Sequence, residues 1–149
     1  MAQLIQLVQL QLAEKGNASL VVTGGSMLPM LRPMKDSVLL APPDQFGKGD
    51  IILYQRENGQ YVLHRILRKK EGYVICCGDN QYEKERVENT WVLAVVTDFY
   101  KLRKKYSVTH KGYRLYKWSW VTLFPIRRFL LWMVRRVYSL KNKLRGEQL

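Results

Sequence analysis

The chain has 149 residues, enough for one domain with a hydrophobic core of its own and too few for two ordinary domains. Its composition, 47% hydrophobic and 25% charged, is that of a globular protein and excludes a wholly disordered chain. The charge is uneven, because residues 101–149 hold 14 of the 25 Lys and Arg residues but one of the 12 Asp and Glu residues. This segment therefore carries the entire net charge of +13.

Cysteine content and hydropathy narrow the class of protein further. Cys76 and Cys77 are adjacent, which disfavours a disulfide between them and offers no metal-ligand spacing, so we expect no metal and no other cofactor. Two free cysteines fit a reducing compartment. The longest unbroken apolar run of the C-terminal segment, residues 129–134, is far below the roughly 18–20 residues that cross a bilayer. We expect a cytoplasmic protein without a membrane span, and peripheral attachment to a membrane stays open.

The N-terminal region predicts a short helix over residues 2–15. Apolar side chains at Leu4, Ile5, Val8 and Leu12 recur at helical spacing, and Gly16 provides a stop signal. The sequence then becomes rich in β-formers broken by Gly, Pro and Asp, which is typical of a small β-barrel or folded sheet. The predicted strands are 19–23, 37–41, 51–55, 61–67, 72–76 and 91–100.

Two further local signals fix the organisation of the chain. Asn58-Gly59 readily adopts the positive φ values of a tight hairpin turn, so the strands that hold Ile51 and His64 are predicted to pair. After residue 100 a basic connector leads to an aromatic, basic segment, in which Pro125 predicts a helix that starts there and runs to about residue 143. We therefore expect a catalytic domain over residues 1–107 and a tail over 108–149.

Four short motifs follow one another along the chain and have a coherent chemistry. A serine hydroxyl becomes nucleophilic when a neighbouring base takes its proton, and neutral imidazole does so near pH 7. Ser26 stands in a Gly-rich turn after a predicted strand, where its own N–H can face an oxyanion, and His64 stands mid-strand. The motifs are Gly24-Gly25-Ser26-Met27-Leu28-Pro29, Gly49-Asp50-Ile51-Ile52, Leu63-His64-Arg65-Ile66 and Gly78-Asp79-Asn80.

In their order and separation these motifs resemble the conserved boxes of type I signal peptidases, over residues 21–97. Bacterial members place a lysine before the arginine of the third box, whereas endoplasmic-reticulum and archaeal members place a histidine, as in His64-Arg65. The resemblance implies a mainly β fold of coiled antiparallel sheets shared with LexA-type autoproteases. It also implies a serine endopeptidase with a Ser26–His64 dyad that cuts a signal or leader peptide, bound as an extended strand, after a small residue.

The resemblance also suggests supporting roles and shows departures. Gly24, Gly25, Met27 and Pro29 are expected to form the oxyanion hole and substrate groove. Gly24 replaces a serine that assists the oxyanion hole in bacterial members, so stabilisation would rest on backbone N–H groups, and Met30 replaces a usual threonine. Asp79 either orients His64 or forms a structural ion pair with Arg65, and the sequence leaves both open.

Two other functions compete with the peptidase. A LexA-like self-cleaving regulator is disfavoured because the first 20 residues have no room for a helix-turn-helix and because that group typically uses a lysine base. A catalytically silent peptide-binding relative is disfavoured because Ser26 and His64 are both present. His110 lies in the basic connector and is interpreted as a surface residue.

The basic tail has three interpretations. Arginines and lysines interleaved with Trp118, Trp120, Phe129 and Trp132 suit a helix in an anionic membrane interface, where apolar burial and charge attraction add. The same segment could pack its apolar face on the domain or on a partner helix. Nucleic acid is the less favoured partner, although it offers the same electrostatic attraction.

Overall fold

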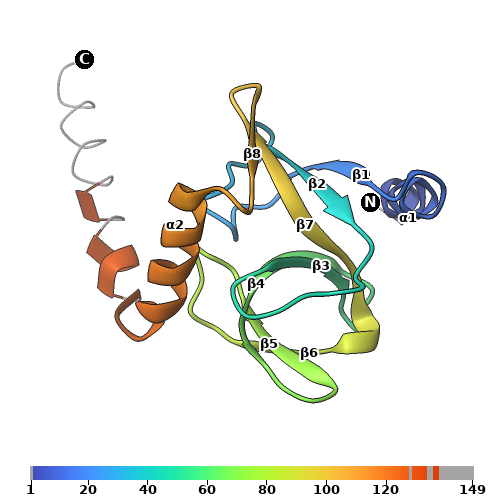
Figure 1. Cartoon of the computed structure of the whole chain (residues 1–149). Coiled ribbons are helices and arrows are strands. Elements are labelled where there is room, and N and C mark those ends of the chain that lie inside the picture. The colour runs from blue at the N-terminus through green and yellow to red at the C-terminus, as the bar shows by residue number, and fades with distance from the viewer. Residues whose placement is uncertain (1, 128, 134–135, 138–149) are drawn as a thin grey trace.

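The computed structural model describes residues 2–127, 129–133 and 136–137. One helix precedes a run of eight strands, and a second helix follows them (Figure 1). The helices are α1 (Ala2–Lys15) and α2 (Lys111–Thr122), with a 3-10 turn at Asn89–Trp91. The strands are β1 (Ala18–Val21), β2 (Ser37–Ala41), β3 (Ile51–Gln55), β4 (Tyr61–Lys69), β5 (Tyr73–Cys77), β6 (Glu85–Glu88), β7 (Val92–Lys101) and β8 (Lys104–Ser107).

The strands form one antiparallel sheet that curls into a half-barrel (Figure 1). Their order is β1-β2-β7-β3-β4-β5-β6, with β8 paired to β7 outside this path. Register shifts at Leu39/Leu40, Leu53/Tyr54 and Ile66/Arg68 bend the sheet. The prediction of a mainly β fold with coiled antiparallel sheets, a short N-terminal helix and a C-terminal helix is confirmed.

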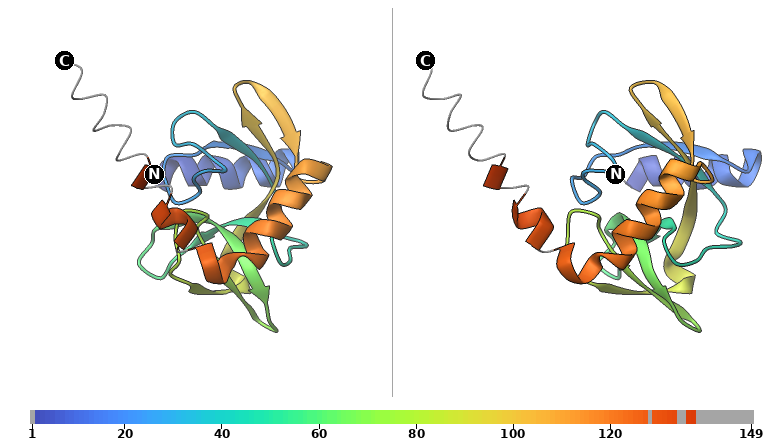
Figure 2. Two further views of the ribbon diagram at one scale, coloured as in Figure 1. Left: turned by 90° about the vertical axis from the view of Figure 1, so that its left-hand side faces the viewer. Right: turned by 60° about the vertical axis from the view of Figure 1, so that its left-hand side comes forward.

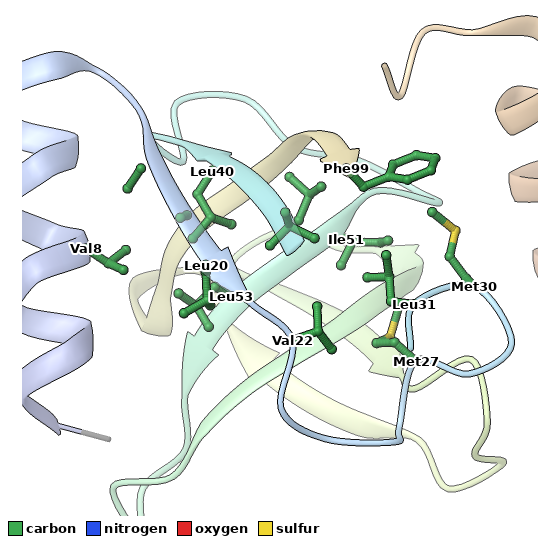
Figure 3. Packing of buried hydrophobic residues seen from close by; sticks show 14 of the residues in the cluster. Val8, Leu20, Val22, Met27, Met30, Leu31, Leu40, Ile51, Leu53 and Phe99 are labelled. Carbon is green, nitrogen blue, oxygen red and sulfur yellow. The ribbon is translucent and has the colours of Figure 1, made fainter. Parts of the chain in front are cut away.

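Two apolar clusters fill the curled sheet. In the larger one, Ile5 and Val8 of α1 pack with Leu20, Leu40 and residues of the turn after β1 (Figure 3). The smaller one lies around Ile52, Ile66 and Cys76 of the central strands. The helix predicted for residues 2–15 is confirmed, and α1 buries Ile5, Val8 and Leu12 of the four apolar positions named for it, while Leu4 is exposed.

The hairpin predicted at Asn58-Gly59 is present and sets the position of His64. Gly59 has a φ of +81°, and the Gly59 N–H donates to the Arg56 carbonyl at 2.9 Å. β3 and β4 pair antiparallel with Ile52 opposite His64. The prediction that these two strands pair is therefore confirmed.

Two strands were not predicted, because each lacks the expected pattern. In β6 the sequence Glu-Arg-Val-Glu offers one buried apolar side chain, Val87. β8 is mostly exposed, and the turn before it places Leu102 and Arg103 at positive φ without a glycine. Neither strand shows the alternation or the turn residues by which strands are found in sequence.

A helical stretch does start beside Pro125, at residue 124, as predicted, but the helix before it, α2, was not predicted. α2 begins at Lys111, after His110, whose exposed ring accepts a hydrogen bond from the Gly112 N–H at 3.2 Å and caps the helix. Packing outweighs the modest helix propensity here, because Tyr113 is buried on the sheet. Helix resumes after Leu123 at residues 124–127, 129–133 and 136–137, with Pro125 in its first turn.

The rest of the predicted helix, to residue 143, lies outside the described residues. Over the part of the chain that is described, no helix combines the length and hydropathy needed to cross a bilayer. Figures 1 and 2 show α1 and α2 on opposite sides of the sheet.

Candidate active site

Ser26 lies in a tight turn that two kinds of contact hold in place. The following residues Met27 and Leu31 are buried in the core, and the Leu31 N–H donates to the Met27 carbonyl at 2.9 Å. In addition, the Asn80 N–H donates to the Ser26 carbonyl at 2.7 Å, and the Asn80 side-chain amide donates to the Gly25 carbonyl at 3.3 Å. The loop after β5 thus fixes the serine backbone.

His64 is held on β4 with its ring 1% exposed. Its Nδ1 lies 3.1 Å from the Tyr54 hydroxyl and 3.3 Å from Glu85 Oε1. The Tyr54 hydroxyl donates to Glu85 Oε2 at 2.9 Å, and Arg56 donates to both oxygens of the same carboxylate. Tyr54 and Arg56 come from β3 and the turn after it, so the β3–β4 hairpin supplies most of this network.

The network favours one tautomer of the imidazole. A carboxylate only accepts hydrogen bonds, so a lone pair on Nδ1 facing Glu85 would be repelled, whereas an Nδ1–H is attracted. Although burial raises the pKa of Glu85, hydrogen bonds from Arg56 and Tyr54 outweigh it and hold this pKa below its usual range. With the proton on Nδ1, the Nε2 atom of His64 is left as a proton acceptor.

Burial keeps the His64 ring neutral. It lowers the pKa of His64 from 6.5 to about 4, and the attraction of Glu85 offsets only part of that effect. At neutral pH the side chain is therefore an uncharged base. It is held in one orientation by Glu85 and Tyr54.

Gly78 lies next to both the Ser26 backbone and the His64 ring. A Cβ added to Gly78 would lie 2.6 Å from the Ser26 carbonyl oxygen and 3.1 Å from His64 Nε2. The serine backbone and the free ring nitrogen are therefore no farther apart than the sum of those two distances. The absence of a side chain at Gly78 is what allows the approach.

Ser26 and His64 also line one groove of about 580 Å³. One wall is formed by residues from 20–27, at the end of β1 and in the turn after it, and the other by residues from 56–64 of the β3–β4 hairpin. Gly24 and Met27 are on the first wall, and a Cβ added at Gly24 would meet nothing within 4 Å. Pro29 lines a separate cavity of about 350 Å³ beside α2, and Gly25 contributes its carbonyl to Asn80.

Asp79 forms the ion pair with Arg65 that the sequence left as one of two alternatives. Both side chains are fully buried, and Arg65 donates to the two carboxylate oxygens at 2.8 and 2.7 Å. Arg65 also donates to the Tyr113 hydroxyl and the Gly49 carbonyl, while the Tyr116 hydroxyl donates to Asp79. The residue against the His64 ring is instead Glu85.

The contacts of Glu85, Tyr54 and Arg56 around His64 were not predicted from the sequence. A signal for Tyr54 was available, because the predicted hairpin places it on the same face of β3 as Ile52, which lies opposite His64. Glu85 is reached through β6, a strand without a sequence signal, so its position was not predictable. Arg127 was assigned to the tail, yet it is buried and donates to the Gly78 carbonyl at 2.8 Å.

The described side chains that could bind a metal ion do not form a cluster. Among the described residues, no three His, Cys, Asp or Glu side chains are grouped as a metal site would require. Cys76 and Cys77 are free and buried, and burial raises the pKa of Cys76 to about 12, so its thiol is protonated and unreactive.

The chain matches no protein-family model, no curated protein and no solved structure. The geometry of the groove is therefore the basis for a functional proposal.

Proposed function

We propose that this protein is a serine endopeptidase in which Ser26 is the nucleophile and His64 the general base. The observation that carries the proposal is that Ser26 and His64 line one groove, with Gly78 beside both the Ser26 carbonyl oxygen and His64 Nε2, and with the neutral ring held from its far side by Glu85. A nucleophile, a base and a group that orients the base are the three parts that acyl transfer requires. The resemblance of the motifs to type I signal peptidases points to the same chemistry.

In the proposed reaction, the Ser26 hydroxyl oxygen attacks the scissile carbonyl carbon while His64 Nε2 takes the hydroxyl proton. Glu85 stabilises the imidazolium that forms, since its carboxylate faces Nδ1. The tetrahedral intermediate collapses, the C–N bond breaks, and the imidazolium returns the proton to the leaving amine. Water then attacks the ester carbon, His64 takes a proton from it, and Ser26 leaves with that proton.

The oxyanion would be held by backbone N–H groups of the turn around Ser26. Gly24 and Gly25 carry no side chain, so a substrate carbonyl can approach the backbone closely there. The open space beside Gly24 supports this assignment, because a Cβ there would meet no neighbouring atom.

An extended peptide suits the groove because both of its walls offer a strand edge. β1 pairs only with β2 among the described strands, so its other edge is open. Along β4, β5 pairs only from Arg65 to Lys69, which leaves the opposite edge of residues 61–64 without a described partner strand. A substrate strand could hydrogen-bond to these edges, which supports a polypeptide, such as a signal or leader segment, as substrate.

Removal of the two catalytic groups tests the proposal. Wild type, Ser26→Ala and His64→Ala would be compared on a peptide library with small residues before the cut, and with a fluorophosphonate, whose fluoride an activated serine displaces. Both variants should lose at least about 10³-fold in turnover, and the label should map to residue 26. Ser107→Ala, outside the groove, is the matched control. Equal turnover in wild type and Ser26→Ala would end the proposal.

A separate substitution tests whether Glu85 supports His64 as a base. Glu85→Gln keeps the shape of the side chain but removes the charge that faces Nδ1, so turnover should fall about 10²- to 10⁴-fold while the fold is retained. Glu83→Gln, an exposed neighbour, should leave turnover unchanged. Loss of activity in both variants, or in neither, would contradict the assignment of Glu85.

A further inference from the structure

α2 and the helical residues after it have two distinct faces. The inner face is fixed to the catalytic domain: Tyr113 and Tyr116 bind the Arg65–Asp79 pair, and the Trp120 indole N–H donates to the Asp79 carbonyl at 3.2 Å. Farther along, Arg127 and Leu131 are buried. The helices are therefore held in one rotation, which determines the side chains that point outward.

The outer face exposes large apolar side chains that cost free energy in water. Leu115 is 66% exposed, Trp118 64% and Phe129 60%. Exposed apolar positions recur three to four residues apart within α2 and again within the helical residues after Leu123. Figure 2 shows these two helical stretches following one another along one side of the protein, with a turn between them. We define the outer α2 surface by the exposed apolar residues Leu115, Trp118, Leu123, Ile126, Phe129, Trp132, Met133 and Val137.

Basic side chains accompany this surface, and the segment that carries it contains no acidic residue. Lys111, Arg114 and Arg136 are exposed beside it, and the Arg136 guanidinium lies 5.7 Å from the centre of the Trp132 ring. No acidic residue stands between Asp98 and Glu147 in the sequence. A surface that combines exposed apolar and cationic groups is complementary to an anionic membrane interface.

We infer that the outer α2 surface binds the headgroup region of an anionic lipid membrane. Apolar side chains would enter the boundary between headgroups and acyl chains, and Lys111, Arg114 and Arg136 would lie at the level of the phosphates. The inner face would meanwhile keep hold of the loop that carries Gly78 and Asp79, so the groove would be held at a fixed orientation to the bilayer. The inference stands whether or not the groove is a peptidase site.

Two other occupants fit less well. A second copy of the chain would bring the same positive charge to the contact, which opposes self-association at moderate salt. Nucleic acid would gain from the cations and from stacking on the three aromatic side chains, but the other five members of the surface are aliphatic. Aliphatic side chains gain most from hydrocarbon, which favours lipid.

Vesicle binding of the full-length chain tests the inference. We expect co-sedimentation with vesicles of phosphatidylcholine and phosphatidylglycerol (about 70:30), at least about tenfold weaker binding to pure phosphatidylcholine, and weakening with added salt. The double variant Leu115→Ser/Trp118→Ser should bind at least about tenfold more weakly, because each lost side chain removes apolar burial. Arg114→Gln should weaken binding about fivefold, near the effect of one cation at an anionic surface.

Leu7→Ser is the control for the double variant. It removes a comparably exposed leucine from α1 and should leave vesicle binding unchanged. Failure to sediment at low salt, or an equal loss of binding in Leu7→Ser, would overturn the inference. So would a dimer in lipid-free solution that the double variant abolishes, or a single-stranded oligonucleotide that displaces the protein from vesicles.

Discussion

Acidification should protonate His64 in the unfolded chain well before it does so in the folded protein. In the fold the ring is 1% exposed, and burial lowers its pKa from 6.5 to about 4. Between these two values the unfolded chain binds a proton that the folded protein does not, so stability rises with pH across that window and is unaffected by His64 above it. Since one pKa unit corresponds to about 1.4 kcal/mol, His64 alone should remove about 3 kcal/mol of stability between pH 7 and pH 4.

Urea unfolding of wild type and His64→Gln from pH 8 to pH 4 would measure this contribution. Glutamine is uncharged throughout, so the difference between the two free energies of unfolding isolates the titration of His64. That difference should be constant above about pH 7 and then change by about 1.4 kcal/mol per pH unit toward pH 4. His110→Asn removes the exposed histidine, keeps a capping side chain, and is the control for the loss of a histidine outside the site.

Parallel stability curves for wild type and His64→Gln would refute the reasoning, because the imidazole would then titrate alike in the folded and unfolded states. In the proposed peptidase the same pKa sets the acid limb of kcat/KM, since the base must be neutral. Activity should therefore persist to about pH 4 and decline tenfold per unit below it. An acid limb near 6.5 would mean that the ring is solvated.

Two further substitutions address the surroundings of the site. Asp79→Asn leaves the buried Arg65 cation without its counter-charge and should cost about 3–5 kcal/mol in urea unfolding, and a loss below about 1 kcal/mol would contradict the fully buried pair. Gly78→Ala brings a Cβ to 2.6 Å from the Ser26 carbonyl oxygen and should slow fluorophosphonate labelling of Ser26 at least about tenfold. Gly47→Ala, whose Cβ finds its nearest neighbour at 4.0 Å, is the matched control, and equal labelling of both variants would count against Gly78 as a contact of the serine turn.

Local sequence signals were sufficient for most of the sheet. Strands 37–41 and 51–55 were predicted with the bounds that they have, because their apolar residues are flanked by turn residues. The Asn58-Gly59 turn fixed the pairing of β3 with β4. β6 and β8 were missed because pairing with the preceding strand, and not an apolar pattern of their own, stabilises them: β6 pairs with β5, and β8 with β7 across a turn without glycine.

The candidate site was likewise predicted only in part from the sequence. Ser26 and His64 were selected from motifs, and the fold brings them to one groove. The partner of the ring was not predictable, since Asp79 and Glu85 are both acidic residues downstream of His64 and only the fold separates them. Arg65 and Asp79 form a buried ion pair, and β6 carries Glu85 to the Nδ1 side of the ring.

The buried guanidinium of Arg127 connects the tail to the groove. Its Nη2 donates to the carbonyls of Gly78 and Gln81, in the loop that holds the Ser26 turn, while its Nε and Nη1 have no hydrogen-bond partner in the described part of the chain. Burial lowers the pKa of Arg127, and the Phe124 ring, 4.6 Å from the guanidinium carbon, offsets some of the cost of burying the charge.

A cation buried at such a cost would be replaced by an apolar side chain if it served packing alone. Its hydrogen bonds instead order the loop of Gly78, whose distance from Ser26 and His64 sets the geometry of the groove. The helical region that carries the outer α2 surface therefore also holds the loop beside the candidate active site. Any partner that shifts these helices would act on Ser26 through that loop.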